Sequence, residues 1–218
     1  VTLGERECSL QRRHQKVMEE APAPNLPEAT RSGLCAAALR LAKSIGYRNA
    51  GTVEFLVDAA GGFYFLEMNT RLQVEHGVTE LVWGVDLVEQ QLRLAQGEPL
   101  PWIQTDLRPQ GHAIECRLAA EDATRAFAPS PGRLALVRPP AGPGVRIDTG
   151  VATGDEISRF YDPMFAKLLV WGETRPEALE RTRAALADFA VLGVNTNLAL
   201  LQHLIDDQTV RDGRLSTQ

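Results

Sequence analysis

The sequence predicts an α+β protein with two regions, and three observations support this class. Polar and apolar residues alternate through residues 63–75, as in the second strand of a β-hairpin. Amphipathic helical patterns lie on either side of that hairpin. Beyond about residue 110, short strand-like runs separated by Pro- and Gly-rich turns indicate antiparallel strands, and two helices follow. We therefore expect one region at residues 1–109 and a second at residues 110–218.

The composition is that of an ordinary globular protein, and it argues against several classes of partner. The 218 residues have room for one large domain or two small ones. A formal net charge of −5 at pH 7 gives no electrostatic reason to expect nucleic acid. No apolar run approaches the ~18 residues of a membrane span. The three cysteines are widely spaced and contain no Cys-x-x-Cys pair, so we expect neither disulfides nor zinc. A reducing compartment follows, either an organelle matrix or, as we expect, the cytoplasm.

In the first region, local signals mark a connector and two helices. Three prolines within residues 21–27 rule out a helix or a central strand there. A helix is expected from about Glu28 to Ile45, because apolar residues recur at positions 34, 38, 41 and 45. A second helix is expected over residues 85–95, with Asp86 as its N-cap and a stop at Gly97.

Between these helices, residues 51–58 and the run from Phe63 predict a hairpin closed by a four-residue loop. If Asp58 pairs with Phe63, Glu54 lies opposite Glu67. Two facing carboxylates repel unless a divalent cation lies between them, and Asn69 would then add a third oxygen ligand. Two alternatives stay open at this point. The hairpin could be exposed with solvated acids, or the strand register could differ by one residue, which would separate Glu54 from Glu67.

If the second strand stays extended as far as residue 75, its polar side chains share one face. Alternation then sets an apolar row behind them, which includes Tyr64 and Leu66. The polar row is unusual for a surface strand because it combines acids, amides and a guanidinium: Glu67, Asn69, Arg71, Gln73 and Glu75.

The second region contains short strands and two closing helices. Strands are expected at residues 112–119, 133–137, 145–148 and 165–171. Helices are expected at about 175–189, with Thr174 as N-cap, and at about 197–205. Near the start of the chain, residues 12–16 carry a basic cluster that is either a solvated charge run or an anion-binding site.

Five segments of the chain together resemble biotin carboxylase, the ATP-grasp component of biotin-dependent carboxylases. They are Gln-Arg-Arg-His-Gln-Lys-Val at 11–17, Glu-Met-Asn-Thr-Arg-Leu-Gln-Val-Glu-His at 67–76, and the segments 111–122, 161–167 and 192–197. The resemblance covers essentially the whole chain. It implies the C-terminal part of an ATP-grasp domain, an antiparallel sheet with flanking helices, at 1–109. It implies the family's own C-terminal domain at 110–218.

The resemblance also implies a reaction and its partners. MgATP, or the Mn²⁺ complex, and bicarbonate would form carboxyphosphate and ADP, and the carboxyl group would then pass to N1 of biotin. A separate biotin carboxyl carrier domain would supply the biotin, and a carboxyltransferase would complete an acyl-CoA carboxylase. The parent enzyme is expected to be a homo-oligomer. No Gly cluster resembles the family's ATP-covering loop, so the isolated chain is expected to be incomplete and inactive.

Site residues carry over from the resemblance by matching position. Glu54, Glu67 and Asn69 resemble the metal ligands. Gln11 and His14, with Glu54 and Glu67, resemble the nucleotide contacts. Lys16, Arg71, Gln73 and the backbone of Val74 resemble the bicarbonate site. Glu75 resembles the general base, and Arg146 the arginine that stabilises the biotin enolate; the residues expected to be catalytic are therefore Glu75, Arg71, Arg146 and Lys16.

Two other functions stay open from the residues. One is a different ATP-grasp ligase, such as a relative of carbamoyl phosphate synthetase, because Glu-x-Asn alone occurs in many such enzymes. The other is a non-catalytic assembly fragment. Without the resemblance, Arg146 would be interpreted as a strand arginine in a surface salt bridge.

Overall fold

The computed structural model describes residues 1–217. By its contacts the chain divides into two compact units. The first unit consists of Val1–Glu7 and Ala21–Gln110. The second unit consists of Cys8–Glu20 and the residues from Gly111 onward. Residues 8–20, which the sequence analysis groups with the first region, therefore belong to the second unit. Each unit combines helices with antiparallel strands, so the predicted α+β class is confirmed.

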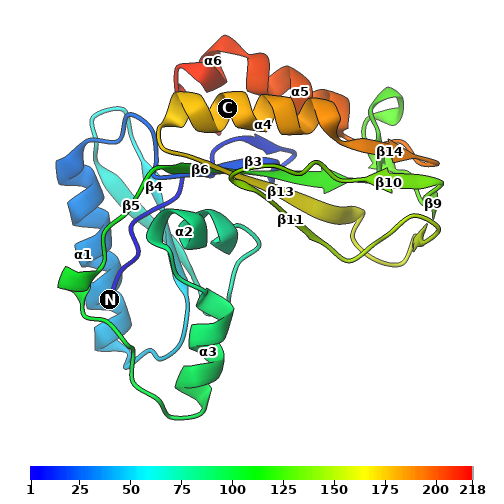
Figure 1. The fold of residues 1–218 in the computed structure, drawn as a ribbon. Coiled ribbons are helices and arrows are strands. Elements are labelled where there is room, and N and C mark those ends of the chain that lie inside the picture. Colours follow the sequence, from blue (N-terminus) through cyan, green and yellow to red (C-terminus); the bar gives the residue numbers. More distant parts are fainter. Residues whose placement is uncertain (218) are drawn as a thin grey trace. The chain divides into compact units, whose positions relative to one another are not determined.

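The first unit is a two-stranded hairpin with helices around it (Figure 1). Asp86 caps α3 by accepting a 2.8 Å hydrogen bond from the Glu89 N–H, as predicted. The elements in order are α1 (Glu28–Ser44), β4 (Thr52–Val57), β5 (Phe63–Asn69), α2 (His76–Trp83), α3 (Leu87–Ala95) and the short η1 (Gln104–Asp106).

Strand β5 ends at Asn69, so the expectation of an extended strand as far as residue 75 is wrong beyond that residue. Helix α2 begins at His76, directly after this stretch. The ladder ends at the pair Thr52 and Asn69. Val78 and Val82, four residues apart, are then buried on one face of α2.

The apolar row expected behind the polar one is not covered. Tyr64 is 61% exposed and Leu66 is 53% exposed. In the part of the chain that is described, this sheet has only the two strands β4 and β5, and the middle of β5, residues 64–67, is exposed.

The second unit is built on a four-stranded sheet in the order β11, β13, β6, β3. Helix α4 covers one face of this sheet and α5 lies beside α4 (Figure 1). The strands of the sheet are β3 (Met18–Ala21), β6 (His112–Ala119), β11 (Val145–Thr149) and β13 (Met164–Gly172). The helices are η2 (Ala123–Arg125), α4 (Arg175–Asp188), α5 (Leu198–Asp206) and α6 (Gln208–Arg211). Short strands complete the unit: β1 (Gln11–Arg12), β2 (Gln15–Lys16), β7 (Glu121–Asp122), β8 (Ala128–Pro129), β9 (Gly132–Arg133), β10 (Leu136–Arg138), β12 (Glu156–Ile157) and β14 (Ala190–Leu192).

The core of the second unit follows the strand period of two. Ile114, Cys116 and Leu118 on β6, with Leu168 and Val170 on β13, are almost completely buried in the cluster that also contains α4 and α5 side chains. Burying a side chain of this size contributes about 1.5–3 kcal/mol. The residues between them point to the opposite face of the sheet and include charged ones.

One predicted strand divides in two. Residues 133–137 were expected to form a single strand, but Arg133 ends β9 and Leu136 begins β10. Strand β9 pairs with β12, whereas β10 pairs with β14. The Leu134 N–H donates to the Asp155 carbonyl and the Ala135 N–H to the Leu192 carbonyl, so the chain changes partners at this point. Alternation within one segment does not reveal such a change, because it depends on distant strands.

Two further expectations concern helix α4 and the membrane. Thr174 caps α4 by accepting from the Glu177 N–H, as predicted. None of the helices within residues 1–217 combines the length and the apolar character that crossing a bilayer requires.

Candidate functional site

The hairpin of the first unit brings Glu54 directly opposite Glu67, as predicted. The predicted route to this pairing is wrong by one residue at the loop, where Val57 rather than Asp58 faces Phe63. Asp58 instead closes the loop, since its Oδ1 accepts from the backbone N–H groups of Ala60 and Gly62 at 2.9 and 2.8 Å. An irregularity next to Glu54 then shifts the register and restores the expected pair.

Asn69 connects the two carboxylates. Its Nδ2 donates to Glu54 Oε1 and to Glu67 Oε1, both at 3.0 Å, so the three side chains share one face of the hairpin. Two carboxylates and an amide oxygen are hard ligands of the kind that Mg²⁺ takes together with substrate phosphates. A half-turn of the Asn69 amide would present its Oδ1 to such a cation. Among residues 1–217 no group of three or more His, Cys, Asp or Glu side chains is placed to hold a metal ion.

Gln73 extends this arrangement into a hydrogen-bonded chain. Its Nε2 donates to Glu54 Oε1 at 2.6 Å, and its Oε1 accepts from Arg6 Nη2 at 2.7 Å. Arg6 also donates to the hydroxyls of Thr52 and Thr79. Since Gln73 is buried, its amide needs partners on both sides, and these contacts fix which end of the amide faces Glu54.

Arg6 is a residue that sequence reasoning missed. It stands alone in a polar segment with no motif around it. The only signal is indirect: a buried amide such as Gln73 requires a donor, but nothing in the sequence shows that the donor lies 67 residues away.

The segment after Asn69 does not present its polar residues on one face. Arg71 is exposed, and its Nη1 donates to the Leu72 carbonyl at 3.2 Å. Val74 is half-buried, and Glu75 is 2% exposed at the N-cap position of α2. The structure therefore joins Glu54, Glu67, Asn69 and Gln73 in one network, while the roles of Arg71, Val74 and Glu75 stay predictions.

In the second unit, Gln11, His14 and Lys16 lie on one small hairpin. Gln11 pairs with Lys16 across β1 and β2, and Arg13 and His14 form the turn with φ angles of 52° and 63°. Positive φ at both central residues suits a tight two-residue hairpin. The run is thus a folded turn that displays His14 to solvent.

Arg12 does not belong to a free basic cluster. Its Nη1 and Nη2 each contact the Glu121 carboxylate at 2.7 Å, and its guanidinium lies 4.2 Å from the Phe127 ring centroid. Because Glu121 is buried, this pair anchors the hairpin to β7. The anion-binding interpretation of the basic run therefore does not extend to Arg12.

Arg146 lies on β11, as expected, and is held by a carboxylate on the same strand. Its Nε and Nη2 donate to Asp148 Oδ1 and Oδ2 at 2.8 and 2.9 Å. Partial burial raises the pKa of Asp148, but the hydrogen bond and charge of Arg146, together with Lys167, outweigh burial and lower that pKa below its usual value. Arg146 thus forms a salt bridge with Asp148, which is the arrangement expected for Arg146 when the resemblance is set aside.

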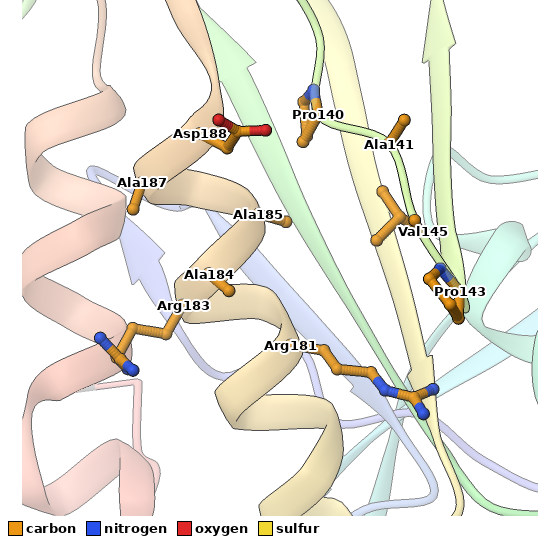
Figure 2. A pocket seen from close by; sticks show the side chains of 11 residues that line it. Pro140, Ala141, Pro143, Val145, Arg181, Arg183, Ala184, Ala185, Ala187 and Asp188 are labelled. Carbon is orange, nitrogen blue, oxygen red and sulfur yellow. The ribbon is translucent and has the colours of Figure 1, made fainter.

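An open cleft in this unit lies elsewhere. Figure 2 shows the loop at residues 140–143 facing α4 across it, with Arg181, Arg183 and Asp188 contributed by the helix. Val145 lines the cleft and Arg146 does not, because neighbouring strand residues point to opposite faces. None of the predicted site residues lines this cleft.

Comparison with known proteins matches both parts of the chain. Residues 115–218 match the biotin carboxylase C-terminal domain, and residues 1–103 match the ATP-binding domain of the carbamoyl-phosphate synthase L chain. The chain is 53% identical to the propionyl-CoA carboxylase alpha chain of Ruegeria pomeroyi, with 100% of the chain and 35% of that protein aligned. It is 48% identical to the biotin carboxylase of a Nostoc species, with 100% of the chain and 48% of that protein aligned.

Solved structures agree with these relatives. The biotin carboxylase domain of a thermophilic 2-oxoglutarate carboxylase, bound to bicarbonate, superposes with a TM-score of 0.96 at 45% identity, over 99% of this chain and 48% of that one. The corresponding domain dimer from Hydrogenobacter thermophilus, in complex with MgADP, ADP and bicarbonate, superposes equally well. The chain thus spans about half or less of the length of these proteins. The chain belongs to the biotin carboxylase family, and it carries that family's C-terminal domain together with part of its ATP-binding region.

Proposed function

We propose that the protein containing this chain is a biotin carboxylase, which uses MgATP and bicarbonate to carboxylate biotin on a carrier domain. The observation that carries the proposal is the pairing of Glu54 with Glu67 through Asn69, with Gln73 hydrogen-bonded to the same carboxylate. This arrangement supports a cation and a small anion close together, which phosphoryl transfer to bicarbonate requires.

The metal ligands in this proposal are Glu54, Glu67 and Asn69. Mg²⁺ held there would neutralise phosphate charge as ADP leaves. Arg71, the Gln73 amide and the backbone of Val74 would bind bicarbonate, because a guanidinium fork matches a planar oxyanion. Glu75 would take the bicarbonate proton as general base. Its burial keeps water from competing for that proton.

The residues of the second unit have separate proposed roles. Gln11 and His14 would contact the nucleotide, and Lys16 would contribute a positive charge for bicarbonate. After carboxyphosphate releases CO₂, the resulting phosphate would take the N1 proton of biotin, and N1 would attack CO₂. Arg146 would stabilise the negative charge that biotin develops on its ureido oxygen.

The domain division at residues 109 and 110, the cytoplasmic location, and the partners are part of the same proposal. The partners are a biotin carboxyl carrier domain and a carboxyltransferase, and the parent enzyme would be a homo-oligomer. The relatives differ in the acceptor that their names give, among them propionyl-CoA, pyruvate and methylcrotonoyl-CoA. The acceptor therefore depends on the carboxyltransferase rather than on this chain.

The test uses the full-length protein that contains this chain. ADP formation is measured with Mg²⁺, ATP, bicarbonate and free biotin, with bicarbonate or biotin omitted in turn. We expect turnover to require bicarbonate, and Glu54→Gln to raise the Mg²⁺ concentration needed by roughly 10-fold or more. Glu89→Gln, on the exposed face of α3, is the matched control. ADP formation that does not depend on bicarbonate, or that requires ammonia or another amine in place of biotin, would reject the proposal in favour of a different ATP-grasp ligase.

The 218-residue chain by itself offers a second test. We expect it to fold at least in part and to form no ADP under the same conditions, because phosphoryl transfer depends on fixed positioning of the nucleotide. Bicarbonate-dependent turnover close to that of the full-length protein would show that this chain holds the complete ATP site.

A further inference from the structure

A row of charged side chains crosses the sheet of the second unit on the face opposite α4. In the strand register, Asp148 of β11 pairs with Lys167 of β13, and Arg146 of β11 pairs with Leu169 of β13. Leu169 in turn pairs with Glu115 of β6. Arg146 is bound to Asp148, and Lys167 Nζ lies 3.4 Å from Asp148 Oδ2 and 3.7 Å from Glu115 Oε2. Charges therefore alternate in sign across three strands.

Burial increases along this row from Arg146 toward Glu115. The side chain of Arg146 is 38% exposed, that of Asp148 is 30% exposed, that of Lys167 11%, and that of Glu115 is fully buried. A cation such as Lys167 is retained at this depth only when carboxylates compensate its charge. The inner end of the row is thus fixed by the sheet, and the outer end is the guanidinium.

We propose that Asp148 is a positioning residue that aims Arg146, with Lys167 and Glu115 holding Asp148 in place. The inference rests on the proposed function, in which Arg146 acts on biotin. A guanidinium has two donor edges, and Asp148 takes the edge formed by Nε and Nη2 through two parallel hydrogen bonds. That fork sets the direction of the Nη1 edge. A long side chain otherwise spreads over many rotamers, so the fork removes disorder at the group that must meet a developing charge.

The position of Asp148 in the network makes this function separable from folding. Replacing Asp148 removes one neighbour of Lys167, but Glu115 stays beside it. Replacing Lys167 instead would leave Glu115 buried without that cation, which is the more damaging change. Asp148 can therefore be altered while the inner part of the row is kept.

The test compares two partial reactions of the full-length protein. Bicarbonate-dependent ATP hydrolysis without biotin reports formation of carboxyphosphate, and biotin-dependent turnover adds the step in which Arg146 acts. For Asp148→Asn we expect kcat of the biotin-dependent reaction to fall about 10- to 100-fold, as for a small misplacement of a reacting group. Hydrolysis without biotin should stay within about 2-fold, because the phosphoryl-transfer step does not use Arg146.

Two variants complete the design. Asp148→Glu keeps the charge but moves it by one methylene, so we expect a loss of about 3- to 10-fold, confined to the biotin-dependent reaction. Asp212→Asn is the matched control, since Asp212 forms an exposed pair with Arg214 at 2.8 Å and should change neither reaction.

Each outcome decides the proposal. Loss of the biotin-dependent reaction alone, smaller for Asp148→Glu than for Asp148→Asn, supports it. Equal loss of both reactions, no loss, or equal rates for the two variants overturns it. If Asp148→Asn does not fold, the comparison of Asp148→Glu with the unmodified enzyme decides by the same split. Arg146→Ala distinguishes failure of the proposed role of Arg146 from failure of the positioning role of Asp148. Normal biotin-dependent turnover of Arg146→Ala rejects the role of Arg146. If Arg146→Ala loses this turnover while Asp148→Asn keeps it, only the positioning role of Asp148 is rejected.

Discussion

The two units hold their polar groups in different ways. In the first unit, amides alternate with carboxylates along Glu67, Asn69, Glu54 and Gln73, with Arg6 at the end. In the second, full charges of opposite sign alternate across a sheet whose other face is a packed core. An amide side chain can rotate by half a turn and so exchange its donor for its acceptor. A charged side chain cannot do this, because Lys and Arg only donate and an ionised carboxylate only accepts. The first arrangement suits groups that must reorganise around a cation, and the second suits a group that must keep one direction.

The two units also differ in how many apolar side chains they bury. The large apolar cluster of the described chain belongs to the second unit. In the first unit, α3 buries no residue, and Leu92 on it is 62% exposed. The proposed metal ligands therefore lie on the unit with the smaller apolar core.

The largest effect is expected at Glu75 in the first unit. Glu75→Gln should lower turnover of the full-length protein roughly 10²–10⁴-fold, the usual contribution of a general base. Glutamine is isosteric, which matters because Glu75 is buried. Bicarbonate-dependent phosphate release is the measurement, with exposed Glu98→Gln as the control. Near-normal turnover of Glu75→Gln would falsify its assignment, and exposed Arg71→Ala should show a comparable loss with less effect on folding.

The next effect concerns stability and pH in the second unit. Glu20 accepts from His112 Nε2 at 2.5 Å and from Arg175 Nε at 2.7 Å. Burial raises the pKa of Glu20, but the hydrogen bonds and charges of His112 and Arg175 together lower it by more. The folded pKa therefore lies below the unfolded value of 4.5. The stabilisation is therefore fully present above pH 4.5 and is lost as the pH falls through the folded pKa.

Glu20→Gln should accordingly cost about 3–5 kcal/mol of unfolding free energy at pH 7, because Arg175 and His112 lose a buried partner. The difference from the unmodified protein should shrink below about pH 4. Denaturant unfolding at pH 7 and at pH 3.5 measures both, with exposed Glu180→Gln as control. A cost that stays constant between the two pH values would contradict the ion-pair account.

A smaller effect is expected at Arg6. Arg6→Met should weaken the apparent affinity for bicarbonate by about 10- to 100-fold, the equivalent of one charge-assisted hydrogen bond to Gln73. The KM for biotin should change little. Exposed Arg48→Met is the matched control. If the KM values for bicarbonate and biotin rise together, Arg6 supports the fold rather than the Gln73 amide.

The smallest effect compares the two helix caps. Thr174→Ala and Asp86→Ala each remove one N-cap hydrogen bond, worth about 1 kcal/mol. Because α4 packs on the core and α3 buries nothing, Thr174→Ala should lower the global unfolding free energy, whereas Asp86→Ala should mainly increase amide exchange within α3. Equal effects on global unfolding would show that the two units unfold as one.

Local signals predicted much of the fold and part of the candidate site. Caps at Asp86 and Thr174, and the pairing of Glu54 with Glu67, follow from residues close together in the chain. The division of residues 133–137 between two ladders did not follow, because its partners β12 and β14 lie far along the chain. The end of β5 at Asn69 did not follow either, because the alternation of residues 67–75 continues past the last paired residue of that strand.

The residues alone specified which chemical groups are present and their local order: acids and an amide on a hairpin, a basic run near the start of the chain, and an arginine on a strand. The partner of each polar group depends on the folded arrangement of the chain. Arg6 reaches Gln73, Arg12 reaches Glu121, and Lys167 lies between Asp148 and Glu115. The physical reason is that hydrogen bonds and ion pairs act over a few ångströms in space, whereas sequence patterns report only neighbours along the chain.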